Sequence, residues 1–318
     1  MHLIDVFNGD ADGICALHQL RLVDSAESEL VTGPKRDISL LKRVKAQTGD
    51  RVTVLDIALS KNRDALDRLL AAGAQVRYFD HHQPGDIPVH PHFEAHIDTD
   101  ANVCTSLLVN QYLQGKQLPW AVVAAFGDNL ADAARQAAVS LNLSADQLAH
   151  LQSLGECLNY NGYGESLDDL FYDPADLYRQ LRPFADPFAF IAESPAYQSL
   201  KTGYQDDMGR AVAVSAAEDR PSGRIFMLPA EKWARRISGV FGNQLAVDSP
   251  AQAHAVLTAK PDGGYVVSVR APLIAKAGAD VLCSQFETGG GRKGAAGINH
   301  LPEAELGRFI ASFFQIYK

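Results

Sequence analysis

The sequence lacks most of the features that mark specialised classes of protein. Its four cysteines are scattered with no CxxC spacing, so neither a disulfide framework nor a zinc ribbon is expected. No low-complexity tract occurs, and no apolar run approaches the ~18 residues of a membrane span. The N-terminal residues carry acids where a signal peptide has a basic region and an apolar stretch. These absences predict a globular protein of the reducing cytoplasm.

Basic residues are also fewer than acidic ones, with 29 Lys and Arg against 38 Asp and Glu. The formal net charge is −9 at pH 7, whereas proteins that bind duplex nucleic acid usually have basic surfaces. Residues 222–318 carry 11 Lys and Arg against 7 Asp and Glu, which leaves 18 against 31 in residues 1–221. The acidic half could hold cations and the basic half could meet an anion, although surface charge also varies by chance between domains. We expect no stable binding to duplexes and none to membranes.

Strands and helices alternate in the first part of the chain. Apolar runs predict strands at 2–7, 52–57 and 76–79, and helical spacing occurs at 14–22 and 63–72. A further strand is predicted at 29–32 and a helix at 38–45. This alternation predicts an α/β fold with a doubly wound, mostly parallel sheet and ligands beyond the carboxyl ends of its strands.

The later part of the chain predicts a helical region and then a second, smaller α/β domain. We expect a catalytic domain over 1–190, a connecting helix and linker over 191–221, and a substrate-binding domain over 222–318. Helices are predicted at 103–113, 120–137, 144–158, 173–181, 192–217, 232–245, 274–286 and 303–317. Strands are predicted at 225–228, 254–258 and 265–270.

Acids and histidines gather where the predicted strands end. Because parallel strands bring their carboxyl ends to one edge of a sheet, these side chains should meet there. Concentrated carboxylates repel one another unless cations neutralise them, and mixed Asp and His sets suit Mn²⁺, with Mg²⁺ or Co²⁺ as alternatives. We therefore expect one or two bound ions. The candidate metal ligands are Asp10, Asp12, Asp56, His81 and Asp128.

Each of these residues also has a purely structural explanation. Asp10 or Asp12 alone is more often a helix N-cap or a turn residue. His81 and the adjacent His82 fit a surface loop, and Asp128 fits a helix cap. Asp56 is harder to dismiss, because the run around it is apolar and a buried carboxylate needs a partner. Their coincidence at the ends of neighbouring strands favours the metal site.

The order of these motifs resembles that of the DHH phosphoesterase superfamily. The triplet that gives the family its name is Asp80-His81-His82 here, and the family's DxDG motif is found at residues 10–13. Asp56 matches the aspartate of the second motif and Asp128 that of the fourth, with Asp98 and Asp100 as alternatives. The resemblance implies that Asp56 bridges the metals, that Asp80 orients a histidine and that His82 donates to the scissile phosphate.

The second half resembles the domain that accompanies DHH domains. The strand motif S-x-R stands at Ser268-Val269-Arg270, and a glycine-rich segment, GGGRKGAAG, follows at residues 289–297. Glycines let the backbone approach an anion closely, and arginine can grip phosphate with two hydrogen bonds. The resemblance implies that a substrate cleft lies between the two domains. Its predicted phosphate-binding residues are Arg270, Gly290, Gly291 and Arg292.

Two positions depart from the family pattern. Many members have a histidine ligand four residues before the first motif aspartate, where this chain has Val6. One metal site would then keep only Asp10 and Asp56, so we expect the affinities of the two sites to differ by well over about tenfold, with Asn8 or water as the alternative ligand. The second departure is Arg292, where the family usually has a histidine in GGGH.

The resemblance implies a Mn²⁺-dependent phosphohydrolase of the phosphodiesterase or exonuclease type. Its substrates would be small nucleotides or short single-stranded oligonucleotides, as in oligoribonucleases and phosphoadenosine-phosphate phosphatases, with a more distant likeness to RecJ. The alternative is a catalytically impaired protein that binds nucleotides in the same cleft, and inorganic pyrophosphatase is a weaker enzymatic alternative. The sequence does not decide between a monomer and a homodimer.

Overall fold

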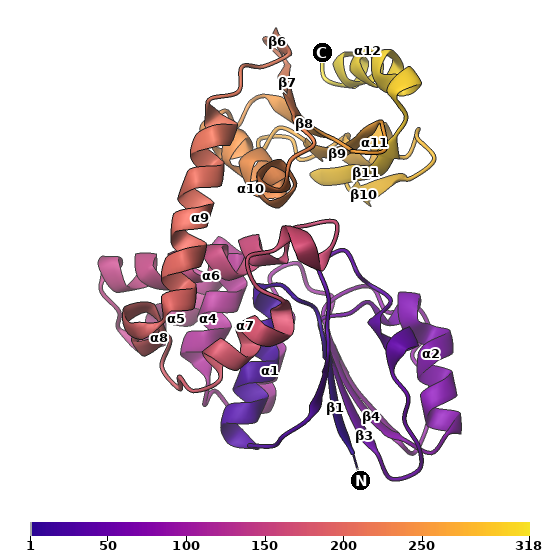
Figure 1. Ribbon diagram of the computed structural model, residues 1–318, viewed down its shortest axis with the longest axis vertical. Coiled ribbons are helices and arrows are strands. Elements are labelled where there is room, and N and C mark those ends of the chain that lie inside the picture. Colours follow the sequence, from indigo (N-terminus) through magenta and orange to yellow (C-terminus); the bar gives the residue numbers. More distant parts are fainter. Residues whose placement is uncertain (1) are drawn as a thin grey trace. The chain divides into compact units, whose positions relative to one another are not determined.

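The computed structural model describes residues 2–318, which form two compact units (Figure 1). The N-terminal unit ends at Thr202 and the C-terminal unit begins at Gly203. The division falls inside a long helix, α9 (Pro195–Val212). The predicted boundaries at 190 and 222 lie on either side of this helix.

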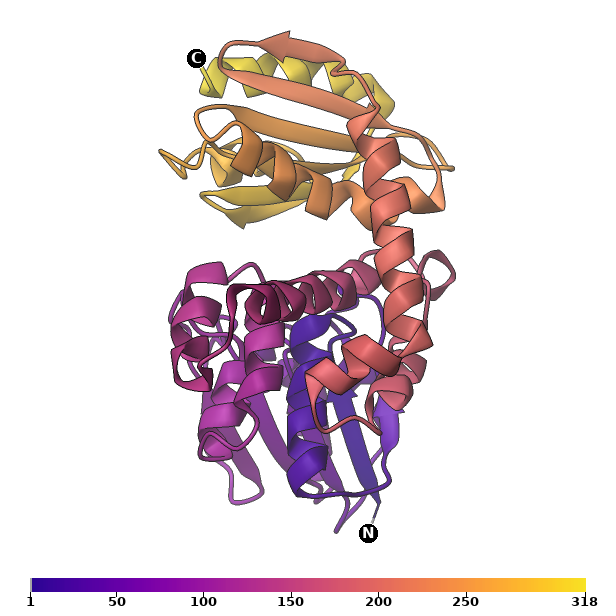
Figure 2. The ribbon, with the colours of Figure 1, turned by 90° about the vertical axis from the view of Figure 1, so that its left-hand side faces the viewer.

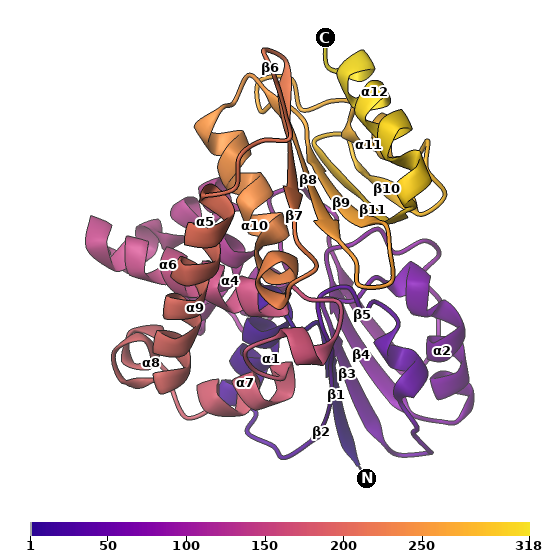
Figure 3. The same cartoon turned by 45° about the horizontal axis from the view of Figure 1, so that its top comes forward.

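A five-stranded parallel sheet forms the centre of the N-terminal unit. Its strand order is β2 (Glu29–Val31), β1 (Leu3–Phe7), β3 (Arg51–Leu55), β4 (Gln75–Asp80) and β5 (Phe93–Ile97). Every pair of neighbours is parallel, which confirms the predicted sheet. Figure 3 shows β5 beside β4 at one edge. This strand escaped prediction because most of its side chains are partly or fully exposed, so it lacks an apolar run.

Helices cover both faces of this sheet, as a doubly wound fold requires. Figure 1 shows α2 (Leu59–Ala71) on one side of the strands and α1 (Ala11–Val23) on the other. On the α2 side, Leu66 and Leu69 pack with Val54 and Val76 of the sheet in one apolar core. The remaining helices are α3 (Thr105–Tyr112), α4 (Leu118–Gly127), α5 (Ala131–Ala138), α6 (Ala145–Gly162), α7 (Pro174–Leu181) and α8 (Pro187–Glu193). Short 3₁₀ turns cover Leu40–Arg43, Val139–Leu141 and Leu167–Asp169.

Local sequence explains where several of these helices begin and end. Ser144 caps α6 in a capping box with Gln147, an arrangement that satisfies two otherwise unpaired backbone N–H groups. Asp173 caps α7, whose first residue is a proline. The single helix predicted over 120–137 is instead split into α4 and α5, because Asn129 has a left-handed backbone with φ of 62°. The break places Asp128 directly after α4.

The C-terminal unit is a six-stranded mixed sheet with helices on both faces (Figure 2). The strand order is β10 (Gly289–Arg292), β11 (Ala295–Leu301), β9 (Tyr265–Arg270), β8 (Ala253–Ala259), β7 (Gly223–Leu228) and β6 (Glu218–Arg220). Phe309 and Phe313 of α12 (Leu306–Ile316) pack with α11 (Ala279–Cys283) and the sheet in one core, while α10 (Lys232–Asp248) covers the other face. A final 3₁₀ turn spans Glu303–Glu305.

The structure of the second unit confirms the predicted smaller α/β domain. One of the helices predicted in this unit is shorter than expected. Only Ala279–Cys283 is helical within the predicted 274–286 segment, which begins with a turn in which Lys276 and Gly278 have positive φ. Among the described residues, none of the helices combines the length and the apolar character needed to cross a bilayer.

Candidate metal centre

The parallel register of the sheet sets the candidate site in place. Phe7 pairs with Leu55, and Leu55 pairs with Phe79, so the residues that follow these strands leave the sheet at one edge. Two backbone hydrogen bonds continue the alignment, from Asn8 N–H to the Leu55 carbonyl at 3.2 Å and from Asp56 N–H to the Phe79 carbonyl at 3.0 Å. The carboxyl edge therefore collects the polar residues that follow β1, β3 and β4, as predicted.

Asp10 and Asp12, although only two residues apart, have different partners. Asp10 is the N-cap of α1, and its Oδ1 accepts hydrogen bonds from the N–H groups of Asp12 and Gly13 at 3.0 and 3.1 Å. The carboxylate of Asp12 accepts from the N–H groups of Thr105 and Ser106 at the start of α3, both at 2.7 Å. The capping function of Asp10 is thus real, but it uses only one carboxylate oxygen.

Asp56 has a backbone conformation that few side chains tolerate. Its φ is 60°, in the left-handed region where Asp and Asn are the usual non-glycine residues. The side chain is 4% exposed, and its Oδ1 accepts a hydrogen bond from the Thr105 hydroxyl at 3.1 Å. The turn after β3 therefore directs a buried carboxylate into the cluster.

The triplet Asp80-His81-His82 forms a small hydrogen-bonded unit. Asp80 Oδ1 accepts from the His81 backbone N–H at 2.9 Å and from His82 Nδ1 at 2.7 Å. His81 Nδ1 lies 2.9 Å from the carbonyl of Val103 and must donate to it, because a carbonyl only accepts. His81 Nε2 is then left facing Asp56 Oδ1 at 3.5 Å and Asp128 Oδ2 at 3.7 Å. This is the tautomer that a metal ligand requires.

Close packing of α1, α4 and α6 brings Asp128 beside His81. A methyl group at Gly127 would lie 2.4 Å from Ala11 Cβ, and one at Gly155 would lie 2.1 Å from the Val123 carbonyl oxygen. Only glycine at these positions lets α1, α4 and α6 approach so closely. Asp98 and Asp100, the alternatives for this motif, are exposed and bonded to their own loop. The structure therefore places Asp128, and not the alternatives, beside His81.

The charges of this cluster are unbalanced. Burial, followed by repulsion from neighbouring carboxylates, raises the pKa of Asp56 well above its usual value. Burial also raises the pKa of Asp12, with further contributions from Asp128 and Asp10, although His81 lowers it. A cation bound among these carboxylates would offset their mutual repulsion.

The donor set fits a divalent ion. Two groups of ligand atoms each lie within 4.8 Å of one another, Asp12 with His81 and Asp128, and Asp56 with His81 and His82. Mixed imidazole and carboxylate ligands suit Mn²⁺ and similar ions. Asp56 and His81 also lie well inside the separation of about 6 Å that a shared coordination shell allows.

Lys35 is the residue that the sequence analysis missed. Its Nζ lies 2.6 Å from Asp10 Oδ2 and 3.4 Å from Asp128 Oδ1. The loop after β2 carries it, and the loop is tied to the end of α6 by a backbone hydrogen bond from Lys35 N–H to the Gly162 carbonyl at 2.9 Å. No sequence motif indicates a role for this lysine, because its partners lie 25 and 93 positions away in the sequence.

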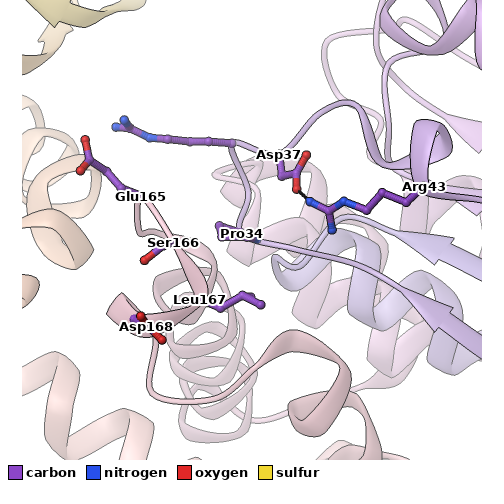
Figure 4. Close-up of a pocket in the computed structure, with 8 residues that line it drawn as sticks. Pro34, Asp37, Arg43, Glu165, Ser166, Leu167 and Asp168 are labelled. Atoms are coloured by element: carbon purple, nitrogen blue, oxygen red, sulfur yellow. Dashed lines mark ion pairs between the residues drawn. The ribbon is translucent and has the colours of Figure 1, made fainter.

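A cavity of about 510 Å³ is lined in part by Pro34 and Arg36, the neighbours of Lys35 in the sequence (Figure 4). Pro34, Asp37 and Arg43 lie on one side of it and Glu165, Ser166 and Leu167 on the other. Arg36 and Asp168 complete the lining. Asp37 and Arg43 form an ion pair with each other, so part of the charge along this wall is already neutralised.

The predicted phosphate-binding residues of the C-terminal unit lie on two strands of its sheet. Arg270 on β9 is held by hydrogen bonds from its guanidinium to Asn243, Ser268 and the Gly239 carbonyl, at 2.6, 2.9 and 3.2 Å. Gly290, Gly291 and Arg292 belong to β10, which pairs with β11 in a hairpin. The side chain of Arg292 is exposed.

Gly290 and Gly291 of this hairpin differ in whether the structure has room for a side chain. A methyl group at Gly291 would lie 2.5 Å from Ala296 Cα, so its small size is needed for pairing. A methyl group at Gly290 would meet nothing within 4 Å. The lack of a side chain at Gly290 therefore leaves backbone open to a ligand rather than relieving a clash.

Comparisons with known proteins find similarity at the level of structure. No protein-family model and no curated protein matches the sequence. The exonuclease RecJ bound to manganese is 16% identical, with a TM-score of 0.64 over 98% of this chain and 89% of that one. RecJ from Thermus thermophilus in complex with Mn²⁺ gives 16% and 0.62, over 98% of this chain and 51% of that one.

A third solved structure is similar in length as well as in fold. The pGpG-specific phosphodiesterase PggH from Vibrio cholerae is 12% identical, with a TM-score of 0.56 over 99% of both chains. These similarities agree with the motif order of Asp10, Asp56 and Asp80-His81-His82. The chain therefore shares the fold of RecJ and PggH, and its motifs resemble those of the DHH phosphoesterase superfamily.

Proposed function

We propose that the protein is a metal-dependent phosphoesterase that hydrolyses small nucleotides or short single-stranded oligonucleotides. The observation that carries this proposal is the convergence of His81 Nε2, in the tautomer of a metal ligand, with Asp56 at 3.5 Å and Asp128 at 3.7 Å. The fold shared with RecJ and PggH supports a phosphodiester substrate.

The residues that would hold the ion are Asp12, Asp56, His81 and Asp128, with Asp10 beside them. A divalent ion supplies Lewis-acid polarisation of a phosphoryl oxygen and lowers the pKa of a bound water. The protein contributes the fixed positions of these ligands. Backbone N–H groups hold Asp12, the Thr105 hydroxyl holds Asp56 and the Val103 carbonyl holds His81.

His82 is the proposed donor to the phosphate. Its Nδ1 bonds to Asp80 at 2.7 Å, which fixes the ring, and its side chain is 44% exposed. Burial lowers the pKa of His82, but the hydrogen bond and the charge of Asp80 outweigh that effect, so its pKa is raised. The imidazole therefore keeps its second proton at a higher pH than an ordinary histidine, and can donate it to a phosphoryl oxygen.

The C-terminal unit would bind the rest of the substrate. Arg292 is exposed and Gly290 leaves its backbone open, so both can approach a phosphate. Arg270 supports the same surface from β9 through its bonds to Asn243 and Ser268. The phosphate-binding function of these residues stays a prediction.

A panel of substrates with added Mn²⁺ tests the proposal. It should include pGpG, a short single-stranded oligonucleotide, 3′-phosphoadenosine 5′-phosphate, a cyclic dinucleotide and pyrophosphate. We expect turnover of at least one nucleotide, none after chelation, and about a thousand-fold less in the Asp56→Asn variant. Tight nucleotide binding without turnover under any divalent ion would instead support the catalytically impaired alternative, and turnover of pyrophosphate alone would support the pyrophosphatase alternative.

A further inference from the structure

Lys35 inserts a positive charge into the candidate metal centre. Its side chain is only 27% exposed, and its Nζ contacts three acceptors: Asp10 Oδ2 at 2.6 Å, Asn159 Oδ1 at 3.3 Å and Asp128 Oδ1 at 3.4 Å. An ammonium group has three N–H donors and no acceptor, so this set matches its bonding capacity. The loop that carries it is anchored at Gly162, so the lysine is part of the folded site.

The three carboxylates of the cluster differ in their partners. Asp12 is held by the backbone N–H groups of Thr105 and Ser106, and Asp56 accepts from the Thr105 hydroxyl. Asp10 instead has the ammonium group of Lys35 at 2.6 Å, so its counter-ion belongs to the protein.

The same region lacks the residue that would complete a second metal site. Val6 is fully buried in the apolar core of the sheet, where it can supply no ligand. Asn8 has only an amide oxygen to offer in place of an imidazole, and its amide nitrogen donates to the Lys35 carbonyl at 3.5 Å. Neither position 6 nor position 8 therefore supplies Asp10 with an imidazole, and a lysine contacts it instead.

We propose that the ammonium group of Lys35 takes the place of one of the two divalent ions, so that each chain binds a single ion through Asp12, Asp56, His81 and Asp128. The proposal rests on the metal site of the proposed function, but it concerns the number of ions rather than turnover. A lysine ammonium is a compact point charge that neutralises carboxylates without needing a set of deprotonated ligands.

Counting ions in the wild type and in Lys35→Met tests this proposal. Methionine keeps the length and apolar stem of lysine but removes the charge, and Lys42→Met, at an exposed lysine of the same region, is the matched control. Calorimetric titration of the metal-free full chain with Mn²⁺ gives the stoichiometry. Electron paramagnetic resonance separates an isolated Mn²⁺ from a magnetically coupled pair.

We expect one ion and an isolated signal in the wild type and in Lys42→Met. In Lys35→Met we expect a second ion, bound about ten- to a hundred-fold more tightly than any second ion in the wild type, and a coupled signal. Two ions with a coupled signal in the wild type, or one ion in a folded Lys35→Met, would overturn the proposal. Lys35→Arg keeps the charge and should keep the single ion, so it serves if Lys35→Met does not fold.

A pair of aspartate variants gives an independent test. Asp10→Asn removes the partner of Lys35, and it should change the affinity for the single ion by less than about threefold, whereas Asp12→Asn should weaken it by about ten- to a hundred-fold. Equal losses in the two variants would contradict the proposal, because Asp10 would then act as a ligand. These counts need no substrate. An inactive protein that gives them would overturn the proposed function and leave the role of Lys35 standing.

Discussion

The two units present their charged residues in opposite ways. In the N-terminal unit, Asp12 and Asp56 are buried and held by N–H and hydroxyl groups of the protein. In the C-terminal unit, Arg292 is exposed on a hairpin whose neighbouring Gly290 faces open space. In the N-terminal unit, carboxylates are therefore buried close together in a hydrogen-bonded site. In the C-terminal unit, a positive charge lies on the surface.

This difference supports the different tasks proposed for the two regions. A rigid, buried cluster with raised carboxylate pKa values has the properties of a catalytic metal site, because its cost in stability is recovered when a cation binds. An exposed arginine beside an open backbone suits substrate binding, where orientation matters less. Changes in the N-terminal unit should therefore reduce kcat, and changes in the hairpin should raise KM.

The largest effect is expected from Asp56→Asn. Asparagine tolerates the left-handed backbone at this position, so only the charge is lost. We expect kcat to fall about a thousand-fold, because several kcal/mol of charge stabilisation by a metal corresponds to about tenfold for each ~1.4 kcal/mol. Steady-state kinetics with Mn²⁺ measures the loss.

The matched control is Asp86→Asn, which changes an exposed aspartate of the same unit. Thermal unfolding of metal-free Asp56→Asn should show equal or higher stability, because the pKa of Asp56 is raised and removing its charge relieves repulsion. An Asp56→Asn variant that is both folded and active would contradict the catalytic task proposed for the N-terminal unit.

A smaller effect is expected from Arg292→Ala. Loss of one hydrogen bond to a charged phosphate should raise KM about tenfold and leave kcat within about twofold. Arg308→Ala is the control, since Arg308 is an exposed arginine of the same unit that pairs with Glu305. A fall in kcat with unchanged KM would show that the hairpin acts on the chemical step and would erase the proposed division of tasks.

The last effect concerns acid stability and leaves the proposed activity aside, and each unit contributes a buried histidine to it. Burial lowers the pKa of His18 in the first unit and of His254 in the second to about 4. Between pH 6.5 and 4 the unfolded chain binds protons that the folded chain does not, so stability falls as the pH falls. For His18 the slope is about 1.4 kcal/mol per pH unit.

Comparison of the wild type with His18→Gln isolates this contribution. Glutamine can still donate to the Phe184 carbonyl that His18 Nε2 contacts at 2.8 Å. The difference in unfolding free energy between the two proteins, measured with urea at several pH values, should shrink as the pH falls from 6.5 to 4. The difference is the readout because the raised pKa of Asp56 acts in the opposite direction in the same unit. A difference independent of pH would contradict the neutral, buried His18.

The sequence predicted the elements that depend on local pattern. The parallel sheet and the edge that unites Asp56 with His81 follow from apolar runs and from the polar residues after them. Lys35 could not be predicted, because its partners are brought together only by packing of the β2 loop against α1, α4 and α6. The split between α4 and α5 was missed because it depends on one left-handed residue, Asn129, inside an otherwise helical pattern.

The dependence of hydrolysis on bound metal tests the central claim most directly. The full chain is stripped of metal, Mn²⁺ is returned in steps, and the bound ion and the initial rate on the best nucleotide substrate are measured in the same samples. We predict no turnover in the stripped protein and a rate that rises in proportion to the ion bound at Asp12, Asp56, His81 and Asp128. Turnover that persists in the stripped protein, or a rate independent of bound Mn²⁺, would contradict the account.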